Sequence, residues 1–95
     1  MAIDVRVEAV DGRGALRAYD GDEVLGSTVW VRSGDDVVIV QHTGVEPAAR
    51  GRGVGRALFE ALVDWARSSG TRLSVSCPYM IRQFHAHPGA KDVLR

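Results

Sequence analysis

The second half of the chain holds the residues that are best suited to chemistry. The first group is the stretch RGRGVGRAL, residues 50–58, in which glycines and arginines alternate ahead of an apolar pattern. Glycine inside a helix costs about 1 kcal/mol relative to alanine, so stability alone does not explain Gly53 and Gly55 at a helix start. Glycines there let an anion approach unpaired backbone N–H groups. The stretch therefore predicts a phosphate or pyrophosphate site, to which its arginines add positive charge.

Two common phosphate-binding motifs fit this stretch poorly. A Walker motif needs Lys and Ser/Thr after its last glycine, where this chain has Arg56 and Ala57. A dinucleotide fingerprint needs a third glycine where Arg56 stands, and an acidic residue about twenty positions further on, where the sequence reads TRLSV. The pattern Arg/Gln-x-x-Gly-x-Gly/Ala, met by Arg50, Gly53 and Gly55, fits better.

Cys77 and His42 are the two residues that we expect to react. Cys77 ends an apolar segment and precedes Pro78, which suits the first position of a helix. A helix N-terminus favours the thiolate, so Cys77 could accept an acyl group from a thioester or protonate a departing thiolate. His42 ends another apolar segment and would act as general base. An inert buried cysteine and a packed histidine are the alternatives.

No metal site is expected, because the sequence has neither Cys-x-x-Cys nor His-x-x-x-His spacing. His85 and His87 are two positions apart on an expected short helix and so point in different directions. Tyr79 is expected to pack, although a role as an acid stays open.

Four strands precede the glycine stretch in the expected fold. Alternating or continuously apolar segments at 3–10, 15–20, 23–32 and 37–43 are separated by turn signals, including DGRG at 11–14. Short connections predict that these strands pair antiparallel. In the first of them, one face is expected to be buried, namely Ile3, Val5, Val7 and Ala9.

The hydrophobic period then changes to that of a helix. An amphipathic helix of about four turns, capped by Gly70, is predicted from helically spaced apolar residues: Val54, Leu58, Ala61, Leu62 and Trp65. A fifth strand follows at 72–77 and then a short helix from Pro78 that ends at Pro88. One face of that helix is expected to carry Met80, Ile81 and Phe84.

The strand at 37–43, the long helix and the strand at 72–77 form one βαβ unit, whose strands should be parallel. Ligands bind outside the carboxyl ends of such strands. We therefore expect one crevice to collect the glycine stretch, His42 and Cys77. His42 and Cys77 should end neighbouring strands, about 5 Å apart.

Length and composition bound the class of protein. The 95 residues predict a single domain, 1–95, with 45% hydrophobic and 25% charged residues. The formal net charge of zero argues against general nucleic-acid binding. One cysteine excludes an intrachain disulfide and fits a reducing compartment, and no signal peptide or membrane-spanning run is recognised, so we expect a cytoplasmic protein.

The ordered combination HTGVEP, RGRGVG, SCPY and HAHPG, over about residues 36–90, resembles the small single-domain GNAT-like N-acetyltransferases of the GNAT superfamily. The resemblance implies an α+β fold with a mixed, mostly antiparallel sheet, acetyl-CoA as the donor and an amine as the acceptor. It implies that Cys77 lies near the thioester. The implied CoA-binding residues are Arg50, Gly51, Arg52, Gly53, Val54 and Gly55 for the pyrophosphate, and Thr43, Gly44 and Val45 for the pantetheine arm.

Larger GNAT enzymes carry helices between their first strands that roof the acceptor site, whereas residues 10–35 show no helical period. The acceptor side should therefore be open, which fits either a bulky amine, such as that of a protein, or no acceptor. A non-catalytic CoA- or acyl-CoA-binding module is the main alternative, and a phosphate-binding interaction domain is a second one. Neither the acceptor nor the oligomeric state is predicted, although a monomer is compatible with the sequence.

Overall fold

The computed structural model describes residues 2–10 and 12–95, without the side chain of Val10. Within these residues the chain forms one sheet, two α-helices and two short 3-10 helices. Asp11, part of the expected turn at 11–14, lies outside the described residues, and Arg13 and Gly14 already belong to a strand. The elements are β1 (Asp4–Val10), β2 (Arg13–Asp20), β3 (Glu23–Arg32), β4 (Val37–Val45), η1 (Pro47–Ala49), α1 (Val54–Ser69), β5 (Arg72–Val75), α2 (Pro78–Ala86) and η2 (Pro88–Val93).

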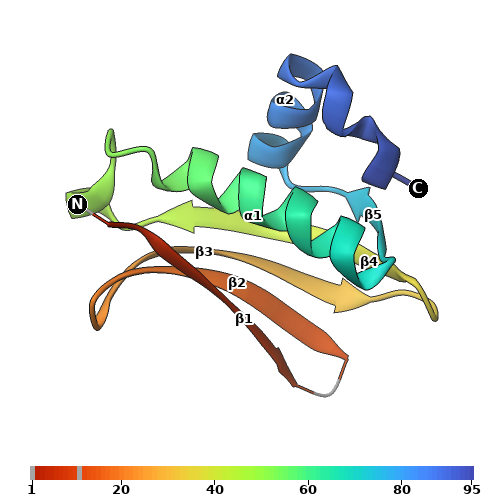
Figure 1. Ribbon diagram of the computed structural model, residues 1–95, viewed down its shortest axis with the longest axis horizontal. Coiled ribbons are helices and arrows are strands. Elements are labelled where there is room, and N and C mark those ends of the chain that lie inside the picture. The colour runs from red at the N-terminus through yellow and green to blue at the C-terminus, as the bar shows by residue number, and fades with distance from the viewer. Residues whose placement is uncertain (1, 11) are drawn as a thin grey trace.

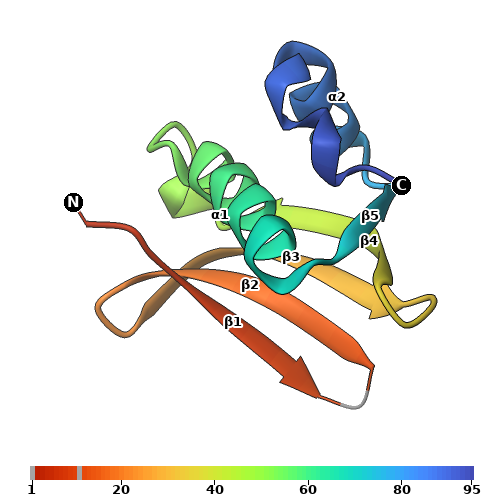
Figure 2. The ribbon, with the colours of Figure 1, turned by 45° about the vertical axis from the view of Figure 1, so that its right-hand side comes forward.

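The sheet is mixed and mostly antiparallel, as predicted. Its order is β1-β2-β3-β4-β5, with antiparallel pairs throughout the first four strands and a parallel pair between β4 and β5. α1 connects the parallel pair and lies along one face of the sheet, while α2 stands beyond α1 near β4 and β5 (Figures 1 and 2). None of the described helices is long and apolar enough to cross a membrane.

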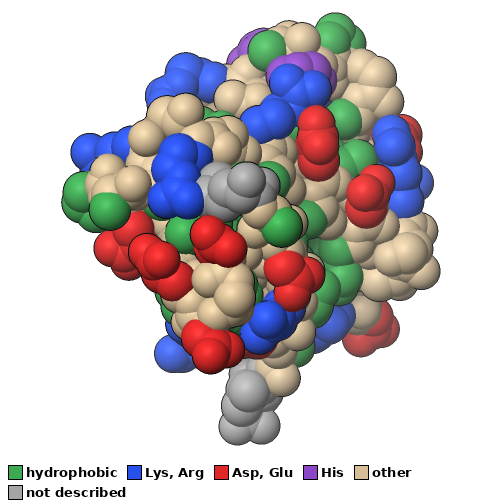
Figure 3. Space-filling model, turned by 60° about the vertical axis from the view of Figure 1, so that its left-hand side comes forward, with side chains coloured by type: hydrophobic (Ala, Val, Ile, Leu, Met, Phe, Trp, Pro, Cys, Tyr) green, Lys and Arg blue, Asp and Glu red, His purple; other side chains and the backbone are tan. Residues whose placement is uncertain are grey.

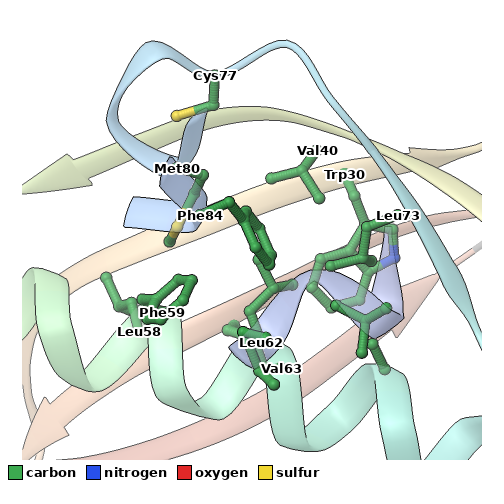
Figure 4. Close-up of a cluster of buried hydrophobic side chains, with 14 of the residues drawn as sticks. Trp30, Val40, Leu58, Phe59, Leu62, Val63, Leu73, Cys77, Met80 and Phe84 are labelled. Carbon is green, nitrogen blue, oxygen red and sulfur yellow. The ribbon is translucent and has the colours of Figure 1, made fainter. Parts of the chain in front are cut away.

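The core lies between the sheet and α1 and continues to α2. Trp30 of β3 stacks on Trp65 of α1 with ring centroids 4.3 Å apart. Phe59 of α1 meets Phe84 of α2 edge to face at 5.1 Å (Figure 4). The helical pattern in the sequence predicted only the stripe toward the sheet. Val54, Leu58 and Leu62 are buried as predicted, while Ala61 and Trp65 are only partly buried. Because α1 also packs against α2, its buried set includes three further residues, namely Phe59, Val63 and Ala66.

Two apolar expectations outside α1 were wrong. Val5 of β1 and the preceding Ile3 pack partly against the core, but Val7 is 50% exposed and Ala9 is exposed as well, because α1 packs mainly over β2, β3 and β4. In α2, Met80 and Phe84 are buried as predicted, whereas Ile81 is 40% exposed.

The ends of three elements also differ from the prediction. β4 continues to Val45, because β3 stays paired with it as far as Gly26. β5 stops at Val75, two residues before Cys77. α2 ends at Ala86, two residues before the expected end at Pro88, and Pro88 begins η2, after which Leu94 forms a bridge to Leu73 of β5. Of the two parallel strands in the βαβ unit, β4 therefore continues beyond the point where β5 ends.

Candidate functional site

The two parallel strands separate at Val40. Its carbonyl oxygen accepts hydrogen bonds from the backbone N–H groups of Ser76, at 2.9 Å, and Cys77, at 3.3 Å. β5 ends there, whereas β4 continues through residues 41–45 with β3 as its strand partner. In the described part of the chain no strand pairs with the other edge of residues 41–45, so that edge offers free backbone donors and acceptors. We call residues 41–45 and 76–79 the strand fork.

The glycine stretch begins α1 beside the strand fork. Gly51 and Gly53 have φ values of +80° and +83°, in the left-handed region that favours glycine. A Cβ atom at either position would have nothing within 4 Å, so the backbone faces open space. Gly53 is the N-cap, and its carbonyl accepts the first bond of the helix from Ala57. The N–H groups of residues 54–56 therefore precede the helical ladder and point toward any anion bound there.

The structure adds a second reason for a glycine at position 55. A Cβ atom there would lie 2.7 Å from Cζ of Tyr79 and still closer to the phenol oxygen. The bare backbone of Gly55 thus accommodates the ring of Tyr79, which comes from the first turn of α2. This contact joins the N-terminal turns of α1 and α2 at the strand fork.

The phenol of Tyr79 is a protonated donor at this place. Burial raises its pKa above the ordinary value, the nearby Arg56 and Arg82 guanidinium groups oppose that shift, and Cys77 adds to it. At neutral pH the group therefore keeps its proton and can donate a hydrogen bond.

The arginines around the glycine stretch are balanced by carboxylates. Arg52 lies 3.7 Å from a carboxylate oxygen of Asp20, and Nε of Arg56 lies 2.8 Å from Oε1 of Glu60. Figure 3 shows basic and acidic side chains mixed over this end of the molecule. Such exposed ion pairs contribute little to stability, so a bound phosphate can compete for the arginines.

The residues expected to line a pantetheine arm lie on the long edge of the strand fork. The hydroxyl oxygens of Thr43 and Thr28 are 3.0 Å apart. A Cβ atom at Gly44 would lie 3.2 Å from Nε2 of His42. Val54 is buried in the core, so only its backbone is available to a ligand, whereas Val45 is partly buried and packs against the core.

Cys77 occupies the expected backbone position but turns its thiol inward. It is the N-cap residue of α2, and its carbonyl accepts a hydrogen bond from the N–H of Ile81. Only 2% of its surface is exposed, and it belongs to the same buried cluster as Met80 (Figure 4).

His42 lies on the other face of the sheet. Thr43 meets Thr28, which shares a face with Trp30 and hence with α1. Adjacent strand residues point to opposite faces, so exposed His42 points away from α1. The expectation that His42 and Cys77 end neighbouring strands was wrong: His42 lies three residues before the end of β4, and Cys77 follows β5. No hydrogen bond among the described residues joins them.

The sheet face that carries His42 is uncovered and hollow. A broad hollow of about 1000 Å³ runs across β1, β2 and β3 and reaches Gln41 of β4. A β-bulge lies here, because Trp30 pairs with Val40 and Val29 pairs with His42, which leaves Gln41 as the extra residue. Bulges bend a strand and redirect its side chains, and this one separates Val40, where the strands part, from His42. The sequence carried no signal for the bulge.

Sequence reasoning also missed Thr28 and the contact of Tyr79 with Gly55. Both depend on pairing between distant segments. The described residues contain no group of three or more His, Cys, Asp or Glu side chains that could hold a metal ion.

Comparison with known proteins identifies the family of the chain. The family model described as GCN5-related N-acetyl-transferase matches residues 15–93. No curated protein sequence matches the chain. A GCN5-like protein from Staphylococcus aureus has a similar structure, with a TM-score of 0.67, 21% identity, and coverage of 95% of this chain and 87% of that one.

Two further solved structures share the fold. A Bacillus subtilis acetyltransferase in complex with CoA has a TM-score of 0.67 and 13% identity, over 94% of this chain and 75% of that one. A ribosomal-protein-alanine N-acetyltransferase from Brucella melitensis has a TM-score of 0.60 and 23% identity, over 70% of this chain and 51% of that one. The present chain thus matches only about half the length of the Brucella protein.

Proposed function

This chain belongs to the GCN5-related N-acetyltransferase family, and on that premise we propose that it transfers the acetyl group of acetyl-CoA to an amine arriving from the sheet face opposite α1. The single observation that carries this proposal is the start of α1 beside the strand fork. There a left-handed glycine N-cap, open space and free N–H groups stand next to an unpaired strand edge. Such a pair of features suits a pyrophosphate followed by an extended amide-containing arm.

The donor is held mainly by backbone in this proposal. The segment from Arg50 to Gly55 binds the CoA pyrophosphate through the N–H groups at the start of α1, and Arg50 and Arg52 add charge. The edge from Thr43 to Val45 lines the pantetheine arm. The acetyl group then lies near Val40 and Cys77, where β4 and β5 part.

Transfer follows from the two-sided arrangement. The amine nitrogen attacks the thioester carbonyl, the carbon–sulfur bond breaks, and His42 takes the proton that the amine loses. Cys77 gives its proton to the departing CoA thiolate, and exchange with solvent restores both residues. Because only 2% of Cys77 is exposed, we favour this direct transfer over a relay, in which both thioester and amine must reach the sulfur.

The acceptor in this proposal is an amine of a polypeptide. The hollow that ends at Gln41 is broad and open, with an apolar floor that includes Ala15 and Val29 and charged walls that include Glu8 and Arg17. A small amine would gain little from so wide a surface, whereas an extended peptide can contact both floor and walls. We further propose that residues 1–95 act as one domain and work in the cytoplasm, where a lone cysteine stays reduced.

Donor binding is tested by calorimetry with CoA on Gly53→Val and on Gly70→Val as a matched control. Both glycines are left-handed, both have open space around Cβ, and they cap opposite ends of α1. The two variants should lose similar stability, but only Gly53→Val should lose CoA affinity, by about tenfold or more. Equal CoA affinities in the two folded variants would contradict the proposed site.

Transfer is tested by incubating the protein with acetyl-CoA and a panel of peptides, polyamines and small amines, followed by intact mass spectrometry. An acetylated peptide supports the proposal. An acetyl adduct on Cys77 without acceptor would replace direct transfer by a relay. Tight CoA binding without turnover on any acceptor would leave a CoA-binding module.

A further inference from the structure

A pair of threonine hydroxyls lies under the long edge of the strand fork. Thr28 of β3 is directly opposite Thr43 of β4 in the antiparallel register. Their Oγ1 atoms are 3.0 Å apart. Thr28 is completely buried, whereas Thr43 is partly exposed. Thr28 is thus a completely buried polar side chain. Its described side-chain partner is Thr43, which belongs to the strand fork.

Counting donors favours one direction of this hydrogen bond. Each hydroxyl has one proton to give, and only one of the two protons can lie between the oxygens. If Thr43 donated, the proton of Thr28 would be buried without an acceptor among the described side-chain contacts, which is unfavourable. Either hydroxyl could donate across this distance, but the burial of Thr28 favours Thr28 as the donor and Thr43 as the acceptor. The proton of Thr43 is left to point away from Thr28, on the partly exposed side of the pair.

The position of Thr43 limits what it can meet. Gly26 of β3 pairs with Val45 of β4. The start of α1 packs over this pair, because Cγ1 of Val54 would lie 3.2 Å from a Cβ atom at Gly26. Val40, where the strands part, lies on the other side of Thr43, about 10 Å back along β4 at ~3.3 Å per residue. A ligand anchored by its phosphates at α1 and extended toward Val40 must pass Thr43. At that point the CoA chain presents amide groups rather than phosphates.

We infer that Thr28 fixes the hydroxyl of Thr43 as a hydrogen-bond donor to an amide carbonyl of the pantetheine arm. This inference rests on the proposed function and deepens it. It assigns the pantetheine arm a hydrogen bond from the Thr43 side chain, and Thr28 of β3 orients the Thr43 hydroxyl that donates it. Thr43 touches the ligand, and Thr28 is a positioning residue that acts through Thr43. A hydroxyl already polarised by a buried donor is also a better donor itself.

The experiment compares CoA with adenosine 3′,5′-bisphosphate, which has phosphates but no pantetheine arm. Calorimetry is run on the wild type, Thr43→Val, Thr28→Val and the double variant, with Thr43→Ser and Thr28→Ser as controls that keep the hydroxyls. Valine has nearly the shape of threonine, and urea unfolding measures any change in stability separately.

Thr43→Val should weaken CoA binding by about threefold to tenfold, the usual effect of one neutral hydrogen bond. Thr28→Val should weaken it less, and should have no further effect once Thr43 is valine. Neither change should alter binding of the bisphosphate, and the serine variants should bind CoA like the wild type. That pattern supports the inference.

Unchanged CoA affinity in Thr43→Val overturns it, and so does an equal loss for CoA and for the bisphosphate, which would mean a general loosening of the site. An effect of Thr28→Val that persists in the Thr43→Val background overturns the positioning role. If the wild type binds the bisphosphate but not CoA, the arm does not run along β4. If it binds neither probe, the proposed function fails, and this inference fails with it.

Discussion

The contact between Gly55 and Tyr79 allows a quantitative test of how α1 and α2 are joined. We consider the variant Gly55→Ala. In an isolated helix this change stabilises by about 1 kcal/mol, because alanine loses less backbone freedom than glycine. In the protein, the new Cβ atom would lie 2.7 Å from Cζ of Tyr79, too close for real atoms. Overpacking of this kind costs about 1–3 kcal/mol.

The two effects oppose each other, so the net loss of stability should be about 0–2 kcal/mol. That net value alone does not identify the cause. A double-mutant cycle with Tyr79→Ala does, because the truncated side chain no longer occupies the space over Gly55. In that background Gly55→Ala should stabilise by up to about 1 kcal/mol. The expected coupling is therefore about 1–3 kcal/mol.

Urea unfolding followed by tryptophan fluorescence measures each corner of the cycle, since Trp30 and Trp65 stack in the core. Gly53→Ala is the matched control, because a Cβ atom there has nothing within 4 Å and its cost is purely that of the left-handed backbone. It should show no coupling to Tyr79→Ala. A coupling near zero for Gly55→Ala would refute the reasoning that the ring dictates the glycine.

Three other outcomes are expected. His42→Gln should lower turnover by about 10²–10⁴-fold, the usual contribution of a general base, and leave CoA affinity by calorimetry unchanged; unaltered turnover would move the base elsewhere. Trp65→Ala should lose about 2–4 kcal/mol in urea unfolding together with the near-ultraviolet circular dichroism of its stack on Trp30, while Trp65→Phe should lose less. The pKa of Asp92 lies below its ordinary 3.8, mainly because Arg67 donates a hydrogen bond to it. The stabilisation by this pair is therefore complete above that ordinary value and is lost as the pH falls through the lower folded-state pKa, so Asp92→Asn should flatten the stability curve on the acid side of the ordinary value.

The fold could largely be predicted from the sequence because most of its signals are local. Alternation in β3 and the helical period of α1 each lie within one segment, and the structure confirms β3 at Glu23–Arg32 and a left-handed Gly70 at the end of α1. What failed depends on neighbours far away in sequence. Val7 alternates correctly but lies beyond the cover of α1, and Phe59 is buried because α2 packs on a second side of α1.

The candidate site shows the same division. The helix starts near Gly53 and at Pro78 were predicted from local residue types and spacing, and the structure has both, with Gly53 as the N-cap of α1. The reason for Gly55 could not be read in this way, because Tyr79 is 24 positions later and meets it only after α1 and α2 have packed. The inward turn of Cys77 likewise follows from the packing of α2 against the core, to which the spacing of Cys-Pro-Tyr gives no clue.

His42 and Cys77 lie apart, so the proposed donor-binding and acceptor-binding residues lie on different faces of the sheet. His42 and Thr43 are adjacent in β4, so the alternation of the strand must send one to each face of the sheet. Thr43 joins Thr28 on the face that α1 covers, where the glycine N-cap offers its donors. His42 is exposed on the open face, next in the chain to Gln41, which lines the broad hollow. His42 and Thr43 are thus adjacent in sequence but face opposite sides of the sheet; in the proposed function, Thr43 faces the donor and His42 faces the acceptor. Substitution of Thr43 should therefore change CoA affinity, and substitution of His42 should change turnover. The free-energy effects of the two substitutions should be additive, because no side-chain contact among the described residues links Thr43 and His42.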